Sequence, residues 1–554
     1  MRRTLVAAML VGVLALPAAA AAQTSAGPPR TAPASLTAPP AGFTTSARDA
    51  LRIADRTGDA RSVRAAHPRV SATVTLWQNR RWDVVYRVGE RGLLEVNVTA
   101  AGRVSGTWKG LQTDALYARA PGGPLLSSPF VLVGLALLSL VPFLDRHRRR
   151  RRLHLDLVAL SGLTAGMALL DARRTGPALW VVYASLAYLA GRALHAAVAR
   201  PRRRSSVLAW RVPTTALAVA LALLVAGRIA VNVTSHSAVD VGAASLIGAD
   251  RIMHGAPLYT DNEAHGDTYG PLNYVAYIPF ELALPYRGGY TALAAAHAAA
   301  ITFDLLTLLG LLLLGRRLRA GPRGRRLGLA LAWVWAASPA TLLTLQQSSD
   351  DALLAALSVW TLLAFSRPAA RGALLGAAAA VKLFPALLLG ALWRGHREDP
   401  RRGRTVAVVA FLAISGFAFA VYEPADGGVR ALWNCTLGYQ LSRRPDFSLW
   451  AQYPGLGVLK AVVVGAALAL AAVVAFLPRG ARSMPQAAGL AAAVTIALQL
   501  GGGHWFEFYA CWFIPGLLVA LFDATEPLDV AEPAVAGRLT APVDEGARRA
   551  VIMV

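Results

Sequence analysis

Long apolar segments separated by short arginine clusters constrain this chain most strongly. Apolar runs recur from Pro129 almost to the C-terminus, and about 20 apolar residues suffice for a helix to cross a bilayer. Hydrophobic residues make up 55% of the 554 residues and charged residues only 16%, a balance that favours a polytopic membrane protein over a soluble enzyme. The sequence therefore predicts an all-α membrane protein of about twelve transmembrane helices.

The net charge of +25 raises the question of a nucleic-acid partner. The arginines, however, concentrate in clusters between apolar runs, at 147–154, 200–204, 316–326 and 394–404. Such an excess of positive charge in short loops marks the cytoplasmic side of a membrane protein. We therefore expect the lipid bilayer as the partner of these clusters and no nucleic acid.

The N-terminal region predicts export. Residues 1–22 combine Arg2 and Arg3, a short apolar core and an alanine-rich end, the layout of a cleavable signal peptide, with an uncleaved anchor as the alternative. Residues 23–44 are rich in Pro, Ser, Thr and Ala and have too little apolar surface to pack, so they predict a disordered linker. In both alternatives, the residues that follow lie outside the cytoplasm.

A small exported domain is predicted over residues 45–116. A short helix over 47–56 precedes segments in which apolar and polar residues alternate with period two, broken by Gly and Asn turns. This pattern is typical of an antiparallel sheet, and the strand segments resemble PepSY-type domains. The sequence predicts an α+β domain that acts in regulation or recognition, with a simple spacer as the alternative.

The membrane part divides into accessory transmembrane helices over 129–211, a module over 212–523 and a cytoplasmic tail over 524–554. Alternating the spans from an outer N-terminus places the polar stretch that follows the run 213–231 on the outer side. If the run 272–286 also crossed the membrane, the arginine cluster at 316–326 would lie outside. We therefore expect 272–286 to lie at the membrane interface.

The same charge rule predicts a broken helix over 371–394. A straight span would bring the cluster at 394–404 to the outer side, so two half-length helices that meet near Lys382 and Pro385 fit better. Broken helices at membrane depth occur where they line a cavity or are buried in protein. Lys382 is also unusual because the chain has only two other lysines, Lys109 and Lys460; a snorkelling side chain is the alternative.

The stretch from Ser235 to Asn273 is the longest polar, glycine-containing segment between the apolar runs. We predict a long loop on the outer face, because structureless loops of this length are usually functional. The same face receives other polar segments that interrupt apolar runs, and ionisable residues in a membrane usually have a function. The candidate site residues are Asp240, Arg251, His254, Tyr259, Tyr269, Gln346, Gln347, Asp350, Lys382, Arg443, Arg444 and His504.

Five motifs follow one another in an order that resembles a known family. They are Asp240, HGAPLY at 254–259, TYGPLNY at 268–274, LQQSSDDALLAAL at 345–357 and LLGAAAAVKLFPALLL at 374–389. Over residues 213–522 this order is similar to the polyprenol-phosphate-mannose-dependent mannosyltransferases of the GT-C fold. The resemblance implies a polytopic enzyme whose first outer loop carries an acidic base, here Asp240. The family commonly has two prolines after the tyrosine, where this chain has Tyr269, Gly270 and Pro271.

The residue types agree with the glycosyl transfer from a lipid phosphate that the resemblance implies. The reaction needs a carboxylate to accept the acceptor's hydroxyl proton and cations to stabilise the leaving phosphate. Asp240 is the expected base, whereas Asp250 is expected to pair locally. Lys382, Arg251 and the pair Arg443 and Arg444 are candidates for the phosphate.

The sequence predicts a hexosyltransferase of the plasma membrane with an extracytoplasmic active site. Its donor would be a polyprenyl-phosphate sugar, most simply mannose, and its acceptor a glycolipid or glycan. We expect no cofactor and no metal, since no Cys/His metal spacing and no nucleotide-binding glycine motif occurs. A transporter or lipid flippase, expected to have repeated halves, and a signalling or scaffold protein are the alternatives.

Overall fold

A computed structural model of the full chain describes residues 30–77, 81–89, 91–109, 128–143, 152–171, 175–199, 213–234, 240–259, 268–286, 293–395, 400–424, 428–442 and 448–523. The predicted signal peptide and the predicted tail from residue 524 lie outside these residues, as do Arg443 and Arg444.

The N-terminal module is a five-stranded antiparallel sheet with two helices. The sheet has the order β1 (Arg30–Thr31), β2 (Ser71–Trp77), β3 (Arg81–Val88), β4 (Arg91–Thr99) and β5 (Val104–Lys109). Helices α2 (Ala47–Asp55) and α3 (Gly58–Ala66) begin at the capping residues Ser46 and Thr57, whose side chains accept backbone N–H groups that the first turn leaves unpaired.

The core of this module lies between the helices and one face of the sheet. Trp82, Val84 and Tyr86 alternate along β3 and pack with the buried alanines of α2, as a period-two strand pattern requires. The indole of Trp82 donates a hydrogen bond of 3.0 Å to the carbonyl of Thr45, and its ring contacts Phe43. From Arg30 onward the chain therefore joins this module, so the linker predicted over 23–44 is shorter, and a second helix accompanies the predicted one.

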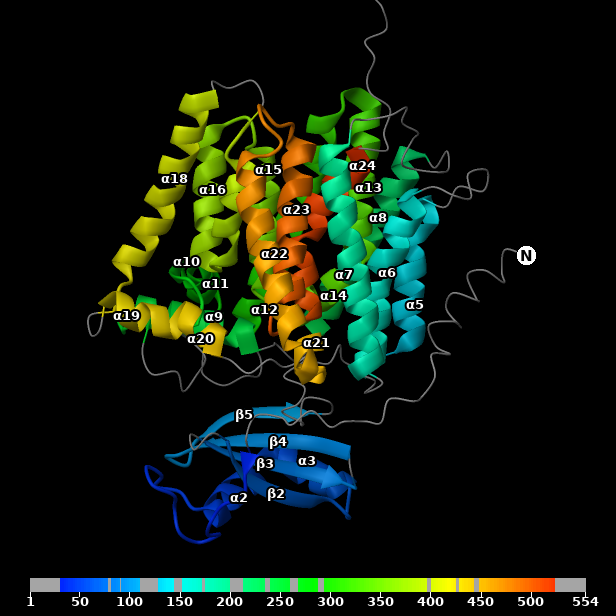
Figure 1. Cartoon of the computed structure of the whole chain (residues 1–554). Helices are drawn as coiled ribbons and strands as arrows, with labels where there is room; N and C mark the ends of the chain where they lie inside the picture. Colours follow the sequence, from blue (N-terminus) through cyan, green and yellow to red (C-terminus); the bar gives the residue numbers. More distant parts are fainter. Residues whose placement is uncertain are drawn as a thin grey trace, which may run out of the picture.

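The rest of the chain is a bundle of helices (Figure 1). Its long elements are α5 (Pro129–Leu140), α6 (Arg152–Asp171), α7 (Thr175–Val198), α8 (Thr214–Thr234), α12 (Ala294–Leu318), α13 (Gly321–Ala337), α14 (Pro339–Gln346), α15 (Asp351–Leu363), α16 (Pro368–Val381), α18 (Pro400–Val421), α22 (Gly457–Phe476), α23 (Met484–Gly501) and α24 (Ile514–Asp523).

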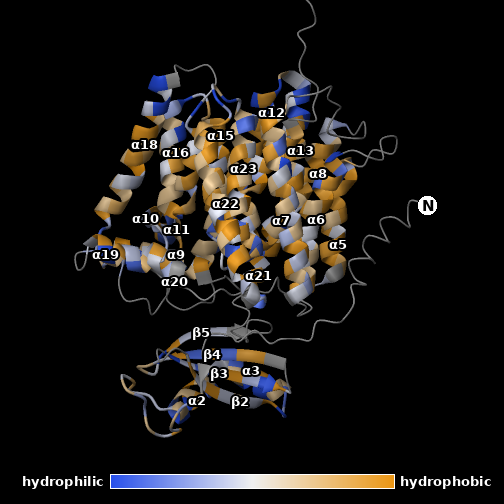
Figure 2. Ribbon diagram, in the orientation of Figure 1, coloured by the Kyte–Doolittle hydropathy of each residue, from blue (hydrophilic) through white to orange (hydrophobic). Residues whose placement is uncertain are grey.

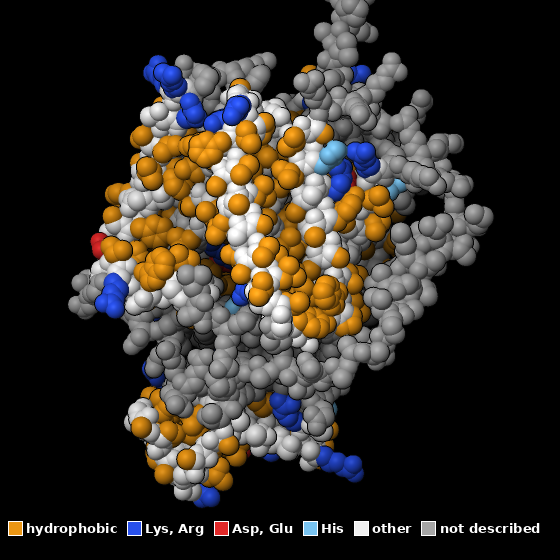
Figure 3. All heavy atoms as spheres, in the orientation of Figure 1, with side chains coloured by type: hydrophobic (Ala, Val, Ile, Leu, Met, Phe, Trp, Pro, Cys, Tyr) orange, Lys and Arg blue, Asp and Glu red, His pale blue; other side chains and the backbone are white. Residues whose placement is uncertain are grey.

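Among the described residues, seven helices are long and apolar enough to cross a membrane, or eight if the bent pair α13 and α14 is one span. The chain is thus a polytopic membrane protein, while the predicted twelve spans stay a prediction. Large apolar side chains on the outside of the bundle face the surroundings, among them Phe417 on α18 and Val458 on α22. Figures 2 and 3 show this apolar flank along the helices.

The two ends of the bundle differ in composition. One end, here called the arginine end, holds the C-terminus of α12 with Arg316 and Arg317 and the arginine-rich first turns of α13 and α18. The other, here called the short-helix end, carries short helices and lies toward the N-terminal sheet (Figure 1). These are α9 (Asp240–Met253), α10 (Pro271–Val275), α11 (Ile278–Ala283), α19 (Gly428–Trp433), α20 (Tyr439–Ser442) and α21 (Leu449–Gln452). The separation agrees with the charge asymmetry that the positive-inside rule describes, which predicts that the arginine end faces the cytoplasm.

The prediction of a long loop over 235–273 is wrong for residues 240–253. Residues Asp240–Met253 form the helix α9, and α10 begins at Pro271. Gly248 explains why this helix was not predicted from the sequence, since glycine has a low helix propensity. In the structure a Cβ on Gly248 would lie 2.1 Å from the ring of Tyr274, so the glycine is required for the packing of α9 on α10.

Candidate functional site

The helix that carries Lys382 is interrupted at that residue. Helix α16 ends at Val381, Lys382 has extended backbone angles, and a 3₁₀ turn (η4, Phe384–Leu388) and the short helix α17 (Leu389–Leu392) follow. Pro385 lies in the first turn of η4, where its missing N–H does not interrupt a helical ladder. The break predicted near Lys382 and Pro385 is therefore confirmed.

Lys382 binds two aspartates at the start of α15. Its Nζ lies 3.0 Å from Oδ1 of Asp350 and is also bonded to Oδ1 of Asp351. The side chain of Lys382 is 12% exposed, while those of Asp350 and Asp351 are 0% and 2% exposed. The aspartates are thus fully buried, and Lys382 is the least buried member of the cluster.

Two further donors hold Asp351 in place. Trp512 donates its indole N–H to Oδ1 of Asp351 at 2.7 Å, and the hydroxyl of Ser349 donates to Oδ2 at 2.8 Å. A buried carboxylate needs such donors to remain ionised. Trp512, in the 3₁₀ turn η7 (Glu507–Trp512), is not among the predicted site residues, because nothing in its sequence context separates it from an interfacial tryptophan.

Aromatic rings flank the ammonium group. Nζ of Lys382 lies 5.3 Å from the ring centroid of Tyr269 and 5.2 Å from that of Trp512, within the range of cation–π attraction. The ring of Trp512 is in turn stacked between Phe384 and Tyr509, with centroid distances of 4.5 and 4.2 Å. The lysine therefore projects between ring faces that are themselves held by stacking.

Tyr269 reaches Lys382 because its loop docks on the end of α16. The N–H of Gly270 donates to the carbonyl of Val381 at 3.0 Å, and a Cβ at position 270 would lie 2.1 Å from the carbonyl oxygen of Ala380. Only glycine allows this approach of two backbones. Gly270, at the position where the resembled family commonly has the first of two prolines, is thus required by the backbone contact.

Tyrosines stabilise the same loop from the other side. The hydroxyl of Tyr259 donates to the carbonyl of Tyr269 at 3.0 Å, and the N–H of Tyr269 donates to the hydroxyl of Tyr274 at 3.0 Å. Tyr259 and Tyr269, two predicted site residues on either side of the interval 260–267, are thereby brought together. The segment after α9 is in this way connected to the lysine cluster.

Three more predicted site residues lie on α9 or directly after it. Arg251 donates to the carbonyl of Leu258 at 3.2 Å, and Nδ1 of the exposed His254 lies 3.0 Å from Oδ1 of Asp250. Asp240 is the first residue of α9, and its side chain lies outside the described part of the structure. Substrate roles for Asp240, Arg251 and His254 therefore stay predictions.

Asp250 also acts on Glu281 of α11. Burial and the neighbouring carboxyl of Asp250 raise the pKa of Glu281 to about 7, since both effects penalise its charged form. Asp250 is thus engaged with His254 and Glu281, in agreement with the expectation that it pairs locally.

Gln346 ends α14, and Gln347 begins the turn that leads to α15; both side chains are buried. At the centre of this turn, Ser348 has a φ of 52°, a left-handed conformation that is uncommon for a residue other than glycine. Asn232 of α8 and His297 of α12 bond to its hydroxyl at 3.2 and 3.0 Å. This turn places Asp350 and Asp351 against Lys382.

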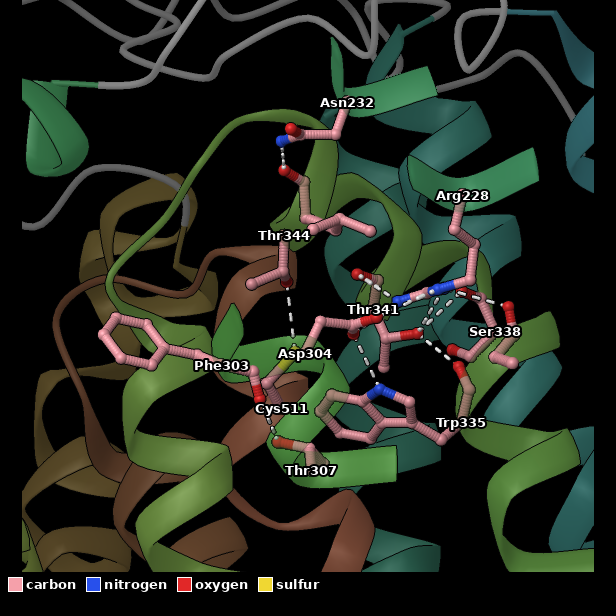
Figure 4. Close-up of polar contacts among 12 residues, drawn as sticks. Arg228, Asn232, Phe303, Asp304, Thr307, Trp335, Ser338, Thr341, Thr344 and Cys511 are labelled. Atoms are coloured by element: carbon pink, nitrogen blue, oxygen red, sulfur yellow. Dashed lines mark hydrogen bonds and ion pairs between the residues drawn. The ribbon is translucent and has the colours of Figure 1, made fainter. Parts of the chain in front are cut away.

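A buried ion pair that the sequence analysis missed lies beside this turn (Figure 4). Arg228 of α8 binds both carboxylate oxygens of Asp304 of α12, at 2.7 and 3.3 Å, and Trp335 donates to the same carboxylate at 2.8 Å. Arg228 also donates to the carbonyls of Ala336 and Thr341 at 2.9 and 3.3 Å. The sequence did indicate that Arg228 and Asp304 could be important, because each is a single charged residue within an apolar run.

These bonds explain the bend of 63° between α13 and α14. Pro339 at the start of α14 lacks an N–H, so the carbonyls before it lose their helical partners. Arg228 supplies a donor to Ala336, and the hydroxyl of Thr341 supplies one to Trp335. Buried charges and carbonyls therefore satisfy one another at the bend.

Three predicted site residues have no contact with Lys382 in the described structure. His504 is partly buried and stacks on Phe506 with a centroid distance of 6.4 Å, so it lies in the aromatic segment that leads to Trp512. Arg443 and Arg444 lie outside the described residues. Within the part of the chain that the structure describes, no group of three or more His, Cys, Asp or Glu side chains is arranged to hold a metal ion.

Comparison with known proteins gives one match. The family model described as Glycosyltransferase family 87 matches residues 268–501, the segment that contains Tyr269, the turn at Ser348 and Lys382. No curated protein and no solved structure matches the chain. Over this segment the chain is similar to glycosyltransferases of family 87, and the match together with the apolar helices indicates a membrane glycosyltransferase.

Proposed function

We propose that the protein transfers a hexose, most simply mannose, from a polyprenyl-phosphate donor to an extracytoplasmic glycolipid or glycan in the plasma membrane. The observation that carries the proposal is the interrupted helix at Lys382, within the segment similar to family 87. The break places an ammonium group beside the aromatic rings of Tyr269 and Trp512, and Asp240 begins the short helix α9. Cation, rings and carboxylate are the groups that a lipid-phosphate sugar requires.

In the proposed reaction, Asp240 accepts the proton of the acceptor hydroxyl as its oxygen bonds to the anomeric carbon of the donor sugar. The bond from that carbon to the phosphate oxygen breaks, and polyprenyl phosphate leaves with the electron pair. Lys382 stabilises the charge that develops on this oxygen. An ammonium has three N–H donors, and Asp350 and Asp351 accept two of them, so the aspartates aim the third donor outward.

Arg251, Arg443 and Arg444 are proposed to supplement Lys382 at the phosphate, and Tyr259, Tyr269, Gln346, Gln347, Asp350, His254 and His504 to shape the substrate site. Asp350 contributes by orienting Lys382, because its carboxylate is buried and bonded to the lysine. The cluster of one lysine and two aspartates has a net negative charge, so additional cations favour the binding of an anionic donor.

The direct test is transfer by the purified protein. Radiolabelled polyprenyl-phosphate sugars are incubated with the protein and with extracted membrane lipids, and the label is followed into a new lipid or glycan. Transfer from a polyprenyl-phosphate hexose supports the proposal. Movement of the intact labelled donor across a vesicle membrane without transfer would contradict it and favour a flippase.

Sidedness gives a second prediction. With Cys435 replaced by alanine, a cysteine at the exposed Ala256, just after α9, should react with an impermeant thiol reagent in intact cells, while one at the exposed Pro322 of α13 should not. The reason is that the arginine end is cytoplasmic. Labelling at 322 without labelling at 256 would invert the topology.

A further inference from the structure

Helix α8 contacts both ends of the short helix α14 through two side chains on one face. Arg228 and Asn232 lie one helical turn apart and are 1% and 0% exposed. Arg228 binds carbonyl groups at the start of α14, as described above. Asn232 binds the other end, where its amide donates to the carbonyl of Leu345 at 2.5 Å and to the hydroxyl of Ser348 at 3.2 Å.

The second contact acts on a strained turn. Ser348 has a left-handed backbone conformation that a side chain disfavours, and such residues persist only when their surroundings hold them. Its hydroxyl has Asn232 and His297 as partners, and the ring of His297 also bonds to the amide oxygen of Asn232 at 3.2 Å. Asn232 is therefore the centre of a network that joins α8, α12 and this turn.

The turn determines where the carboxylates lie. Ser349, Asp350 and Asp351 follow Ser348 directly, and Ser349 bonds to Asp351. If Ser348 relaxed to an ordinary conformation, the backbone direction after it would change and both carboxylates would move relative to Lys382. The position of the ammonium group depends in this way on a residue that does not touch it.

We propose that Asn232 is a positioning residue for Lys382, acting through the turn at Ser348. Its consequence for catalysis rests on the proposed glycosyl transfer, while its consequence for the geometry of Lys382 does not.

The experiment uses the scarcity of lysine in the chain. Purified protein in detergent is treated with an amine-reactive reagent, and mass spectrometry compares modification of Lys382 with that of Lys109 and Lys460. In the unchanged protein Lys382 should react slowly, since it is bonded to two buried aspartates. In Asn232→Ala, the reaction of Lys382 relative to Lys109 should rise about tenfold, as expected for the loss of hydrogen bonds that hold the cluster.

Thr344→Val is the matched control. Thr344 is buried in the same helix α14, and its hydroxyl bonds to the carbonyl of Ala340 and to Cys511 rather than to the turn. Its carbonyl, which accepts the N–H of Ser349, is unchanged in the variant, so the replacement should leave the labelling of Lys382 unchanged. In transfer assays, Asn232→Ala should raise KM for the polyprenyl-phosphate donor more than it lowers kcat. Thr344→Val should alter neither.

His297→Ala provides the second variant, because it removes a partner of Ser348 from a partly buried position and should increase Lys382 labelling even if Asn232→Ala does not fold. Wild-type labelling of Lys382 in both folded variants would overturn the proposal, as would an equal increase in Thr344→Val. If the unchanged protein shows no transfer, the proposed function fails, while the labelling result still decides the role of Asn232.

Discussion

Asp240→Asn should lower the rate of glycosyl transfer by at least about 10²- to 10⁴-fold, the usual contribution of one proton-abstracting group. Asparagine has nearly the size of aspartate but accepts no proton at neutral pH. Because Asp240 is the first residue of α9, the substitution leaves the packed part of this helix, from Ser245 to Gly248 against α10, untouched. Expression, thermal stability and donor binding should therefore stay near those of the unchanged protein.

Asp250→Asn is the matched control for this experiment, since Asp250 lies on the same helix. Its carboxylate is engaged with His254 and Glu281, so its loss should change turnover much less. It should also lower the pKa of Glu281, because the neighbouring negative charge is removed. Near-full transfer by Asp240→Asn in a reconstituted assay, or an inactive Asp250→Asn, would show that the base is assigned to the wrong carboxylate.

Arg228→Leu should destabilise the helical bundle by about 3–5 kcal/mol, the typical cost of leaving one member of a buried ion pair without its partner. Asp304, which is 3% exposed, would remain among apolar helices, and Trp335 would be its remaining hydrogen-bond donor among the described residues. The carbonyls of Ala336 and Thr341 would lose the same arginine. The loss should appear as a lower melting temperature and a lower resistance to denaturing detergent.

The double variant Arg228→Leu with Asp304→Leu separates charge from packing. Replacing both members of a buried pair by apolar residues is often neutral or stabilising, so the double variant should recover much of the lost stability. The unpaired carbonyls at the bend should prevent full recovery. If Arg228→Leu alone melted at the same temperature as the unchanged protein, the ion pair would not hold the bend between α13 and α14.

Sequence patterns with a strong physical cause allowed correct structural predictions. Charge parity across the spans predicted the interruption at Lys382, because a bilayer penalises arginine clusters on the wrong side. Period-two alternation predicted the strands of the N-terminal module. The predicted loop at α9 was wrong, since Gly248, which weakens the helical signal, allows a contact with Tyr274 that only the fold reveals.

In the candidate site, too, some residues could be predicted from the sequence, whereas their contacts depend on the fold. Tyr269 and Lys382 could be selected from their motifs, but in the sequence two helices, α15 and α16, lie between the aspartate pair and Lys382. Trp512 was missed because a tryptophan near a helix end is common at membrane interfaces. Its hydrogen bond to Asp351 depends on the packing of η7 against α15.

By itself, the sequence determined that the chain is a polytopic membrane protein and that a helix breaks at Lys382. Both properties follow from local hydrophobicity and from the positions of charges relative to a bilayer, which any stretch of chain experiences separately. Only the tertiary structure decided the partners of each buried charge: Asp304 for Arg228, and two aspartates for Lys382. Buried charges are tolerated when paired, and pairing depends on which helices pack together, a property of the whole fold.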